Sequence, residues 1–258
     1  MLLVADAGNT NIHVGCYDGE KLICRFAMGV GADRTADEYA FILRALLAEG
    51  GCDISKIDGV IIASVVPSVT GTLKKAISRI TNAEILAVGP GVKTGFPIRL
   101  DNPSELGADL AANAAGAIRA VGYPAIIVDI GTANSVMAID RDGAYIGGCI
   151  MPGVEMSLAA LHSAELLPGV PVGESVSSLG KNTKDCMRAG ALRGGAMAIC
   201  GFIEHYRNHA SIGKNAPVVI TGGQAEWILS YLPEEAKHIP LLTLEGLCAI
   251  WQLNQKKN

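Results

Sequence analysis

The sequence predicts an α/β protein made of two halves with the same design, each holding a mixed sheet and flanking helices. Two observations lead to this prediction. Residues 2–28 and 125–150 each contain a short apolar strand that ends at an aspartate, then a glycine turn and two further strands. Both openings are followed by segments that alternate between helical and strand-like patterns. Because the openings lie roughly half the chain apart, they indicate an internal duplication.

In the first half, the opening strands are expected at residues 2–5, 12–17 and 21–28, with Asp18-Gly19 as a hairpin turn. Apolar residues recur at helical spacing over 36–49, where a glycine pair follows. Asn102 and Pro103 resemble the start of a helix. The remaining expected elements are strands at 60–66 and 84–88, and helices at 68–80 and 104–120.

The second half repeats this order. Its expected strands are 125–128, 136–139, 144–150 and 218–220, and its expected helices are 156–161, 185–208, 224–232 and 244–253. A hinge is expected near residues 117–124. We therefore predict an N-terminal domain at 1–117 and a C-terminal domain at 118–258.

Composition narrows the classes of function. The chain has 258 residues, of which 50% are hydrophobic and 18% charged, so it can bury a large core. A net charge of −4 without a basic stripe argues against binding to nucleic acid or to an anionic membrane. Seven cysteines without a C-x-x-C pair are typical of buried thiols in a reducing compartment. No apolar run has membrane-spanning length, so we expect a soluble cytoplasmic protein.

The sharpest local signal is the turn that begins at Asp6. A carboxylate at the end of a buried strand is costly unless it is paired or binds a metal, so Asp6 could hold magnesium directly or through water. Gly8 permits backbone N–H groups to converge on phosphate oxygens, and Asn9, Thr10 and Asn11 add neutral donors. The alternative is a hairpin turn in which Asp6 caps its own backbone. Taken alone, this motif leaves both interpretations open.

The second half contains a similar turn, from Asp129 through Gly131 and Thr132 to Asn134 and Ser135. A single such turn could be structural. If the two turns face one cleft, they could hold the phosphates of ATP from both sides. The repetition therefore favours a nucleotide site.

A third glycine turn, Gly222-Gly223, follows the expected strand 218–220. Glycines there allow a base and ribose to approach the backbone closely. By itself this signal is weak, because many helices begin after such a turn.

Asp109 is the candidate general base, since a kinase that acts on an alcohol needs a carboxylate to accept the hydroxyl proton. Glu105 and Asp109 are four residues apart and would share a helix face. A solvated helix face explains Glu105 well but Asp109 less well, because small apolar residues surround Asp109. Thr183 precedes a long helix and could simply be its N-cap.

These motifs resemble those of type III pantothenate kinases, members of the acetate/sugar kinase, Hsp70 and actin superfamily. The resemblance runs from Met1 to about Leu253. It rests on Asp6-Ala7-Gly8-Asn9-Thr10-Asn11, Ser64-Val65-Val66-Pro67, Gly89-Pro90-Gly91, Asn102-Pro103, Gly107-Ala108-Asp109, Asp129-Ile130-Gly131-Thr132, Pro152-Gly153, Gly180-Lys181-Asn182-Thr183 and Thr221-Gly222-Gly223.

The resemblance implies two ribonuclease-H-like domains of the actin-like ATPase type and ATP-dependent phosphorylation of pantothenate, the first step of coenzyme A synthesis. It implies a homodimer and, as cofactors, ATP, Mg²⁺ and a monovalent cation, K⁺ or NH₄⁺. ATP and magnesium would be bound by Asp6, Ala7, Gly8, Asn9, Thr10, Asn11, Ile12 and His13, with Thr132, Gly222 and Gly223 completing the nucleotide site. Pantothenate would be bound by Leu100, Gly107, Ala108, Asp109 and Leu110, and by Thr183 across the dimer. Asp109 would be the general base and Asp129 the monovalent-cation ligand.

This chain departs from the family pattern on the acceptor side. Leu110 replaces the arginine of the usual Gly-Ala-Asp-Arg motif, and Leu100 replaces a tyrosine. Leucine cannot clamp a carboxylate as a guanidinium does. Three hypotheses follow: a pantothenate kinase, an inactive paralogue that binds nucleotide and regulates or scaffolds, and a kinase for a different, less anionic alcohol.

Overall fold

The computed structural model describes residues 1–31, 33–164, 167–173 and 176–255. Packing divides the chain into two compact units. Unit 1 comprises Met1–Gly95, Asp101–Arg119 and Leu242–Asn258, and unit 2 comprises Phe96–Leu100 and Ala120–Leu241. The sequence predicts domains at 1–117 and 118–258, which are consecutive segments, whereas these units are defined by packing. The predicted domain boundaries therefore stay a prediction.

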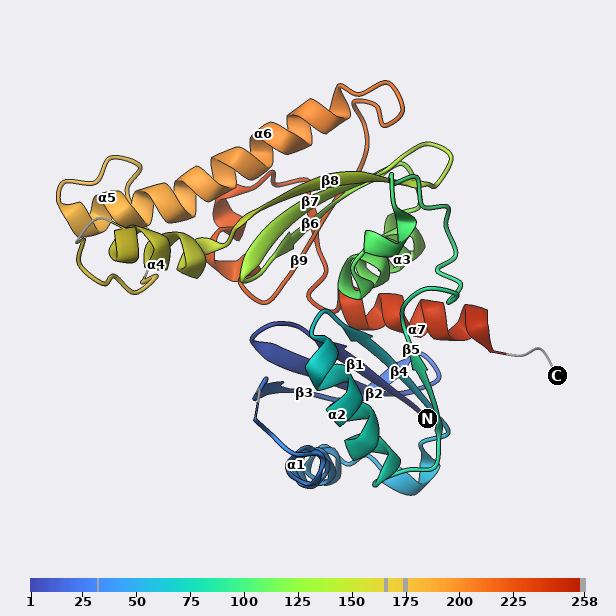
Figure 1. The fold of residues 1–258 in the computed structure, drawn as a ribbon. Coiled ribbons are helices and arrows are strands. Elements are labelled where there is room, and N and C mark those ends of the chain that lie inside the picture. The colour runs from blue at the N-terminus through green and yellow to red at the C-terminus, as the bar shows by residue number, and fades with distance from the viewer. Residues whose placement is uncertain (32, 165–166, 174–175, 256–258) are drawn as a thin grey trace. The chain divides into compact units, whose positions relative to one another are not determined.

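Unit 1 is built on a five-stranded sheet with the order β3-β2-β1-β4-β5 (Figure 1). Strand β1 is antiparallel to β2 and parallel to β4, so the first three strands form a meander and the last two arrive by crossovers. The strands are β1 (Leu2–Ala7), β2 (Asn11–Asp18), β3 (Lys21–Gly29), β4 (Gly59–Ser64) and β5 (Glu84–Ala87).

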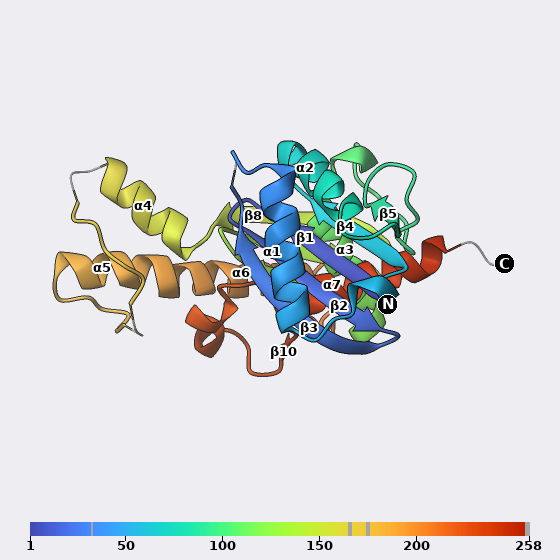
Figure 2. The same cartoon turned by 90° about the horizontal axis from the view of Figure 1, so that it is seen from below.

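Helices α1 (Ala36–Glu49) and α2 (Pro67–Ser78) cover one face of this sheet, and α1 crosses the strands in Figure 2. Thr35 and Glu38 form a capping box that starts α1. The core beneath these helices is aliphatic, as the composition predicts. It includes Leu3, Val14, Ile62, Leu43, Leu73 and Ile77, all at most 1% exposed.

Two further helices belong largely to unit 1, α3 (Ala108–Val121) and α7 (Leu242–Asn254). The two helices approach each other closely because each has a glycine at the contact. A Cβ on Gly246 of α7 would overlap the Ala112 carbonyl of α3, and a Cβ on Gly116 of α3 would overlap the Leu242 carbonyl of α7. Helix α7 also packs on β1 and β4, so the end of the chain completes the first sheet's cover.

Unit 2 repeats the same topology. Its sheet has the order β10-β9-β6-β7-β8, which matches the first sheet strand for strand. Here too the first strand is antiparallel to the second and parallel to the fourth. The strands are β6 (Ala125–Ile130), β7 (Ala133–Ile139), β8 (Tyr145–Pro152), β9 (Val218–Thr221) and β10 (Lys237–His238). The predicted duplicated α/β fold is confirmed.

The helices of unit 2 are α4 (Val154–Ala164), α5 (Thr183–Ala189) and α6 (Gly195–Arg207). A π-helical segment, Gly190–Gly194, joins α5 to α6, so the predicted helix 185–208 is continuous in course but contains one wide turn. These helices pack on one face of the sheet, where Val128, Val136 and Ile220 are buried.

Two predicted helices differ from the structure. Residues 224–232 form two short 3₁₀ turns, Ala225–Trp227 and Leu229–Tyr231, so the predicted helix is wrong there. Ile228 between them has φ −124° and ψ −2°, outside the helical region, and Pro233 prevents continuation. Residues 103–105 form a separate 3₁₀ turn, and α3 begins only at Ala108.

Among the residues described above, no helix is both long and apolar enough to cross a lipid bilayer.

Candidate active site

The first candidate phosphate turn joins β1 to β2. Asp6 is the penultimate residue of β1, and its cross-strand neighbours are His13 on β2 and Ala63 on β4. The Gly8 N–H donates to the Asn11 carbonyl over 3.0 Å, which closes the turn. The side chains of Asn9, Thr10, Asn11 and His13 are exposed. The turn therefore offers polar groups to a ligand beside a strand-end carboxylate.

Two members of this predicted set contribute differently. The side chains of Ala7 and Ile12 are fully buried in the core of unit 1. Any contact between them and a nucleotide would have to use their backbone. The buried side chains of Ala7 and Ile12 alternate with more exposed neighbours because successive residues of a strand point to opposite faces of the sheet.

The second candidate turn occupies the equivalent place in unit 2. Asp129 is the penultimate residue of β6, as Asp6 is of β1, and its cross-strand neighbours are Ser135 and Thr221. Thr132 is exposed in the turn, and its carbonyl accepts the Gly153 N–H over 2.9 Å. The structure thus gathers an aspartate and two hydroxyl residues on one face of the second sheet.

Gly222 is fitted against this aspartate. Its φ is +104°, and a Cβ placed there would overlap the Ile130 backbone and lie 2.5 Å from Asp129 Oδ1. Gly223 is different, because a Cβ there would meet no atom within 4 Å. Gly222 is therefore required by packing around Asp129, whereas Gly223 leaves open space.

The candidate base, Asp109, is the second residue of α3 and is partly buried. Its Oδ1 accepts the Leu110 N–H over 2.8 Å, and a Cβ on Gly107 would lie 2.6 Å from the same oxygen. Burial raises the pKa of Asp109, and the hydrogen bond from Leu110 opposes that rise. A carboxyl with a raised pKa is a better proton acceptor than an ordinary aspartate.

Glu105 does not share a helix face with Asp109, contrary to the prediction. It lies in the 3₁₀ turn before α3, where its carboxylate accepts from Asn102 Nδ2 over 3.0 Å. The break at Leu106 and Gly107 separates the two carboxylates, because Leu106 has an extended conformation.

The remaining acceptor-side candidates are divided between the units. Leu110 is partly buried in unit 1. Leu100 is partly buried in unit 2, where its side chain packs near Gly147. Thr183 is exposed at the first position of α5, and Asn182 rather than Thr183 is the N-cap, since its side chain accepts the Asp185 N–H over 3.0 Å.

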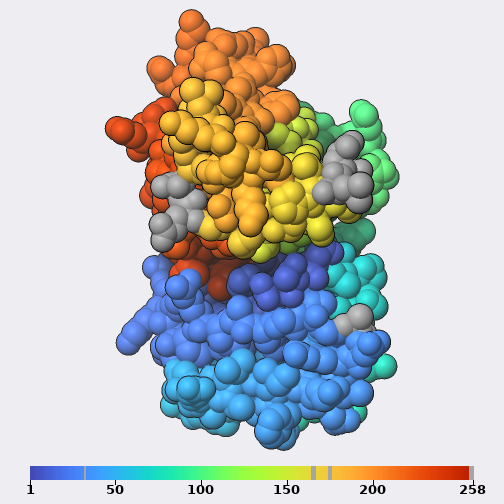
Figure 3. All heavy atoms as spheres, turned by 90° about the vertical axis from the view of Figure 1, so that its left-hand side faces the viewer, coloured from blue at the N-terminus to red at the C-terminus, as the bar shows by residue number. Residues whose placement is uncertain are grey.

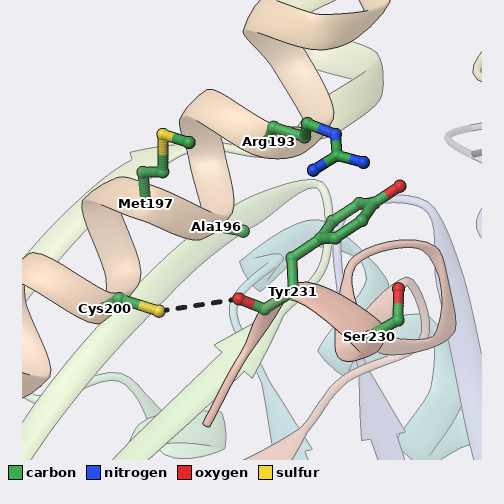
Figure 4. Close-up of a pocket in the computed structure, with 6 residues that line it drawn as sticks. All are labelled: Arg193, Ala196, Met197, Cys200, Ser230 and Tyr231. Atoms are coloured by element: carbon green, nitrogen blue, oxygen red, sulfur yellow. Dashed lines mark hydrogen bonds between the residues drawn. The ribbon is translucent and has the colours of Figure 1, made fainter. Parts of the chain in front are cut away.

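The structure also shows a hollow that the sequence did not predict, between α6 and the 3₁₀ turns of unit 2 (Figure 4). The Arg193 guanidinium lies 4.5 Å from the Tyr231 ring centre there, and Cys200 Sγ donates to the Tyr231 carbonyl over 3.7 Å. None of the predicted site residues lines it.

No group of three or more His, Cys, Asp or Glu side chains in the described part of the chain could hold a metal ion.

Comparisons with known proteins agree with these observations. A family model described as type III pantothenate kinase matches residues 2–205. A type III pantothenate kinase from Moorella thermoacetica is 42% identical over 255 residues, covering 98% of this chain and 100% of the relative. One from Exiguobacterium sp. is 38% identical over 258 residues, covering 99% and 100%.

Solved structures with the same fold include component A of (R)-2-hydroxyglutaryl-CoA dehydratase from Acidaminococcus fermentans. It is 17% identical with a TM-score of 0.57, covering 98% of this chain and 99% of its own. The ROK hexokinase from Thermus thermophilus is 15% identical with a TM-score of 0.50, covering 100% and 99%. At these identities the likeness concerns the fold alone.

Proposed function

The chain belongs to the type III pantothenate kinase family, and we propose that it phosphorylates pantothenate with ATP, with the two aspartate turns and Asp109 as its functional residues. The product is 4′-phosphopantothenate, and the reaction is the first step of coenzyme A biosynthesis. The observation that carries the proposal is the matched placement of Asp6 and Asp129, each penultimate in the first strand of a sheet with the same topology.

Asp109 is proposed as the general base. The acceptor hydroxyl attacks the γ-phosphorus, the bond to the ADP oxygen breaks, and the hydroxyl proton passes to the carboxylate late in the transfer. Its raised pKa suits this role, since a base is most effective when its pKa lies near the working pH. Gly107 acts as a positioning residue, because a Cβ there would lie 2.6 Å from Asp109 Oδ1 and would displace that oxygen.

ATP and a divalent metal are the cofactors of this family. We assign the phosphates to the turn of residues 6–13 and to Thr132, and we assign Gly222 and Gly223 to the rest of the nucleotide. Asp6 is the proposed magnesium ligand. Magnesium bound there would neutralise charge on the phosphates, while the exposed amides of Asn9 and Asn11 orient them.

A monovalent cation, K⁺ or NH₄⁺, is proposed at Asp129. One observation supports it: the Oγ of Ser135, a cross-strand neighbour of Asp129, is buried and has no hydrogen-bond partner among the described residues. Thr221, 1% exposed, is the other cross-strand neighbour of Asp129. The prediction to test is that K⁺, compared with choline, raises the melting temperature of the wild type but not of Asp129→Asn.

We also propose a homodimer in which Thr183 approaches the pantothenate bound by the partner. Large apolar side chains that stay exposed on unit 2 support an interface there. Figure 3 shows the face that α4 and α5 occupy. The large apolar residues that are exposed on the described parts of β8 and α4–α6 are Ile150, Met156, Leu161 and Met197. Sedimentation of the full chain tests the dimer, and a monomer at assay concentration would contradict it.

We also propose that the reaction takes place in the cytosol. The substrate of the family is a cytosolic metabolite, and all seven cysteines are free thiols, as is typical of a reducing compartment.

The decisive experiment measures ADP release from the full chain with ATP, Mg²⁺, K⁺ and pantothenate. Asp109→Asn should lower kcat by a factor of about 10²–10⁴ and leave ATP affinity, measured by calorimetry, unchanged. Glu105→Gln is the matched control, since this exposed carboxylate lies outside α3, and it should keep the wild-type rate. An undiminished rate in Asp109→Asn would refute the proposed base.

The same assay separates the acceptor hypotheses. Release of ADP with other alcohols but not with pantothenate would identify a kinase with a different acceptor. ATP binding without turnover on any alcohol would identify a nucleotide-binding paralogue. Leu110→Arg should lower the KM for pantothenate if a carboxylate lies at this position, because a guanidinium can bind it through two hydrogen bonds.

A further inference from the structure

Three cysteines that lie far apart in the sequence meet in unit 1, outside the proposed kinase site. Cys16 on β2 and Cys24 on β3 are cross-strand partners. Cys52 follows the end of α1, where Gly51 has φ +72° and the Cys52 N–H donates to the Leu47 carbonyl over 2.9 Å. The helix end therefore fixes Cys52 above the two strand cysteines.

The contacts within this cluster are close. The Sγ atoms of Cys16 and Cys52 are 2.7 Å apart, whereas a disulfide bond is about 2.05 Å long. Burial raises the pKa of Cys24, and the neighbouring Cys52 thiol adds to that rise. Gly50 lets Cys24 approach, because a Cβ on Gly50 would lie 2.9 Å from Cys24 Sγ. A sulfur–sulfur bond could thus form with little movement of the backbone.

The three thiols differ in their access to solvent. Cys16 is 0% and Cys52 5% exposed, whereas Cys24 is partly exposed. Burial raises the pKa of both Cys16 and Cys24, so both thiols are protonated at neutral pH, oxidation of the cluster is slow, and access to solvent decides which thiol reacts first. Cys24 is the thiol that a small oxidant reaches first.

We propose that Cys16, Cys24 and Cys52 form an oxidation site in which a hydroperoxide converts two of the thiols into a disulfide that includes Cys52. The Cys24 sulfur attacks the peroxide, the O–O bond breaks, and an alcohol or water leaves as Cys24 becomes a sulfenic acid. The Cys52 sulfur then attacks Cys24, the S–O bond breaks, and water leaves. The two thiols lose two electrons and two protons, which reduce the peroxide.

Exchange then moves the bond to the pair whose Sγ atoms lie 2.7 Å apart. Cys16 attacks the Cys52 sulfur, the Cys24–Cys52 bond breaks, and the Cys24 thiol is regenerated. The product links β2 to the end of α1 through Cys16 and Cys52. A metal site is not the alternative, because among the residues with described positions no such group has an arrangement that could hold an ion.

The test treats the purified full chain with hydrogen peroxide, alkylates the remaining thiols after unfolding, and maps the disulfides by mass spectrometry of a non-reduced digest. We expect a Cys16–Cys52 link that dithiothreitol reverses. Cys24→Ser should form the link at least about tenfold more slowly, because direct oxidation of the two buried thiols is hindered. Cys248→Ser is the matched control, a buried cysteine on α7 that should leave the rate unchanged.

The wild-type map does not depend on any variant folding. If exposed Cys186 is oxidised while Cys16, Cys24 and Cys52 all remain alkylatable, the proposal is overturned. Equal rates in Cys24→Ser and wild type would refute the role of Cys24 as the first thiol oxidised. A link between Cys16 and Cys24 that forms equally in Cys52→Ser would refute the central role of Cys52.

Discussion

Substitution of Gly222 by alanine should destabilise unit 2 and disturb Asp129. Gly222 has φ +104°, and a Cβ there would overlap the Ile130 backbone and lie 2.5 Å from Asp129 Oδ1. The left-handed conformation alone costs alanine about 1–2 kcal/mol, and relief of the overlap adds about 1–3 kcal/mol. We therefore expect a loss of about 2–4 kcal/mol, since part of the overlap relaxes.

The neighbouring glycine supplies the matched control. A Cβ on Gly223 meets nothing within 4 Å, and Gly223 is not among the glycines with positive φ, so Gly223→Ala should change stability by less than about 0.5 kcal/mol. Both variants add one methyl group to the same turn. A difference in their stability therefore reports the backbone conformation and the contacts of the substituted residue.

The assay is thermal unfolding followed by circular dichroism. At about 2–4 °C per kcal/mol for a chain of this size, Gly222→Ala should lower the melting temperature by roughly 4–16 °C. Its K⁺-dependent stabilisation should also be weaker, because the Asp129 carboxylate has to move. If the two variants melt together, the close fit of Gly222 against Asp129 and Ile130 is refuted.

Three further predictions concern the base and an ion pair between half-exposed Arg99 and buried Asp140. Gly107→Ala should lower kcat at least about tenfold with little change in ATP affinity, because the new methyl group displaces the Asp109 oxygen that lies 2.6 Å from its position; an unchanged kcat contradicts this. The wild-type rate should fall with decreasing pH as Asp109 is protonated, and since burial raises its pKa, the midpoint of kcat/KM should lie above that of an ordinary aspartate; a midpoint at or below the ordinary value contradicts it. Arg99→Met should lower the free energy of unfolding in urea by about 1–3 kcal/mol, because it removes the 2.6 Å ion pair to Asp140, which is 2% exposed. Asp142 is the exposed partner of Arg99, so Asp142→Asn should lower the free energy of unfolding by less than about 0.5 kcal/mol.

Local patterns in the sequence predicted most of the elements. The helical spacing over residues 36–49 and the following glycines matched α1, and the apolar runs that end at Asp6 and Asp129 matched β1 and β6. These features depend on the periodicity of a few neighbouring residues, which the sequence records directly. The duplicated fold followed because the same local order occurs twice.

Local patterns failed where several residues compete over a short stretch. The predicted helix 224–232 carried apolar residues at suitable spacing, yet Ile228 leaves the helical region and two 3₁₀ turns form. Asn182 rather than Thr183 caps α5, because neighbouring residues could each fill that position. Such choices depend on how the flanking elements pack.

The sequence by itself therefore determined the class of fold, the position of each strand-end aspartate and the motifs of the family. Only the tertiary structure decided that Gly222 fits against Asp129, that α7 packs on the first sheet, and that Cys52 meets Cys16. The physical reason is that an amphipathic helix face or a small residue indicates, from the sequence, that another segment packs against it. Which segment that is depends on contacts between parts of the chain that are distant in sequence, and only the tertiary structure shows those contacts.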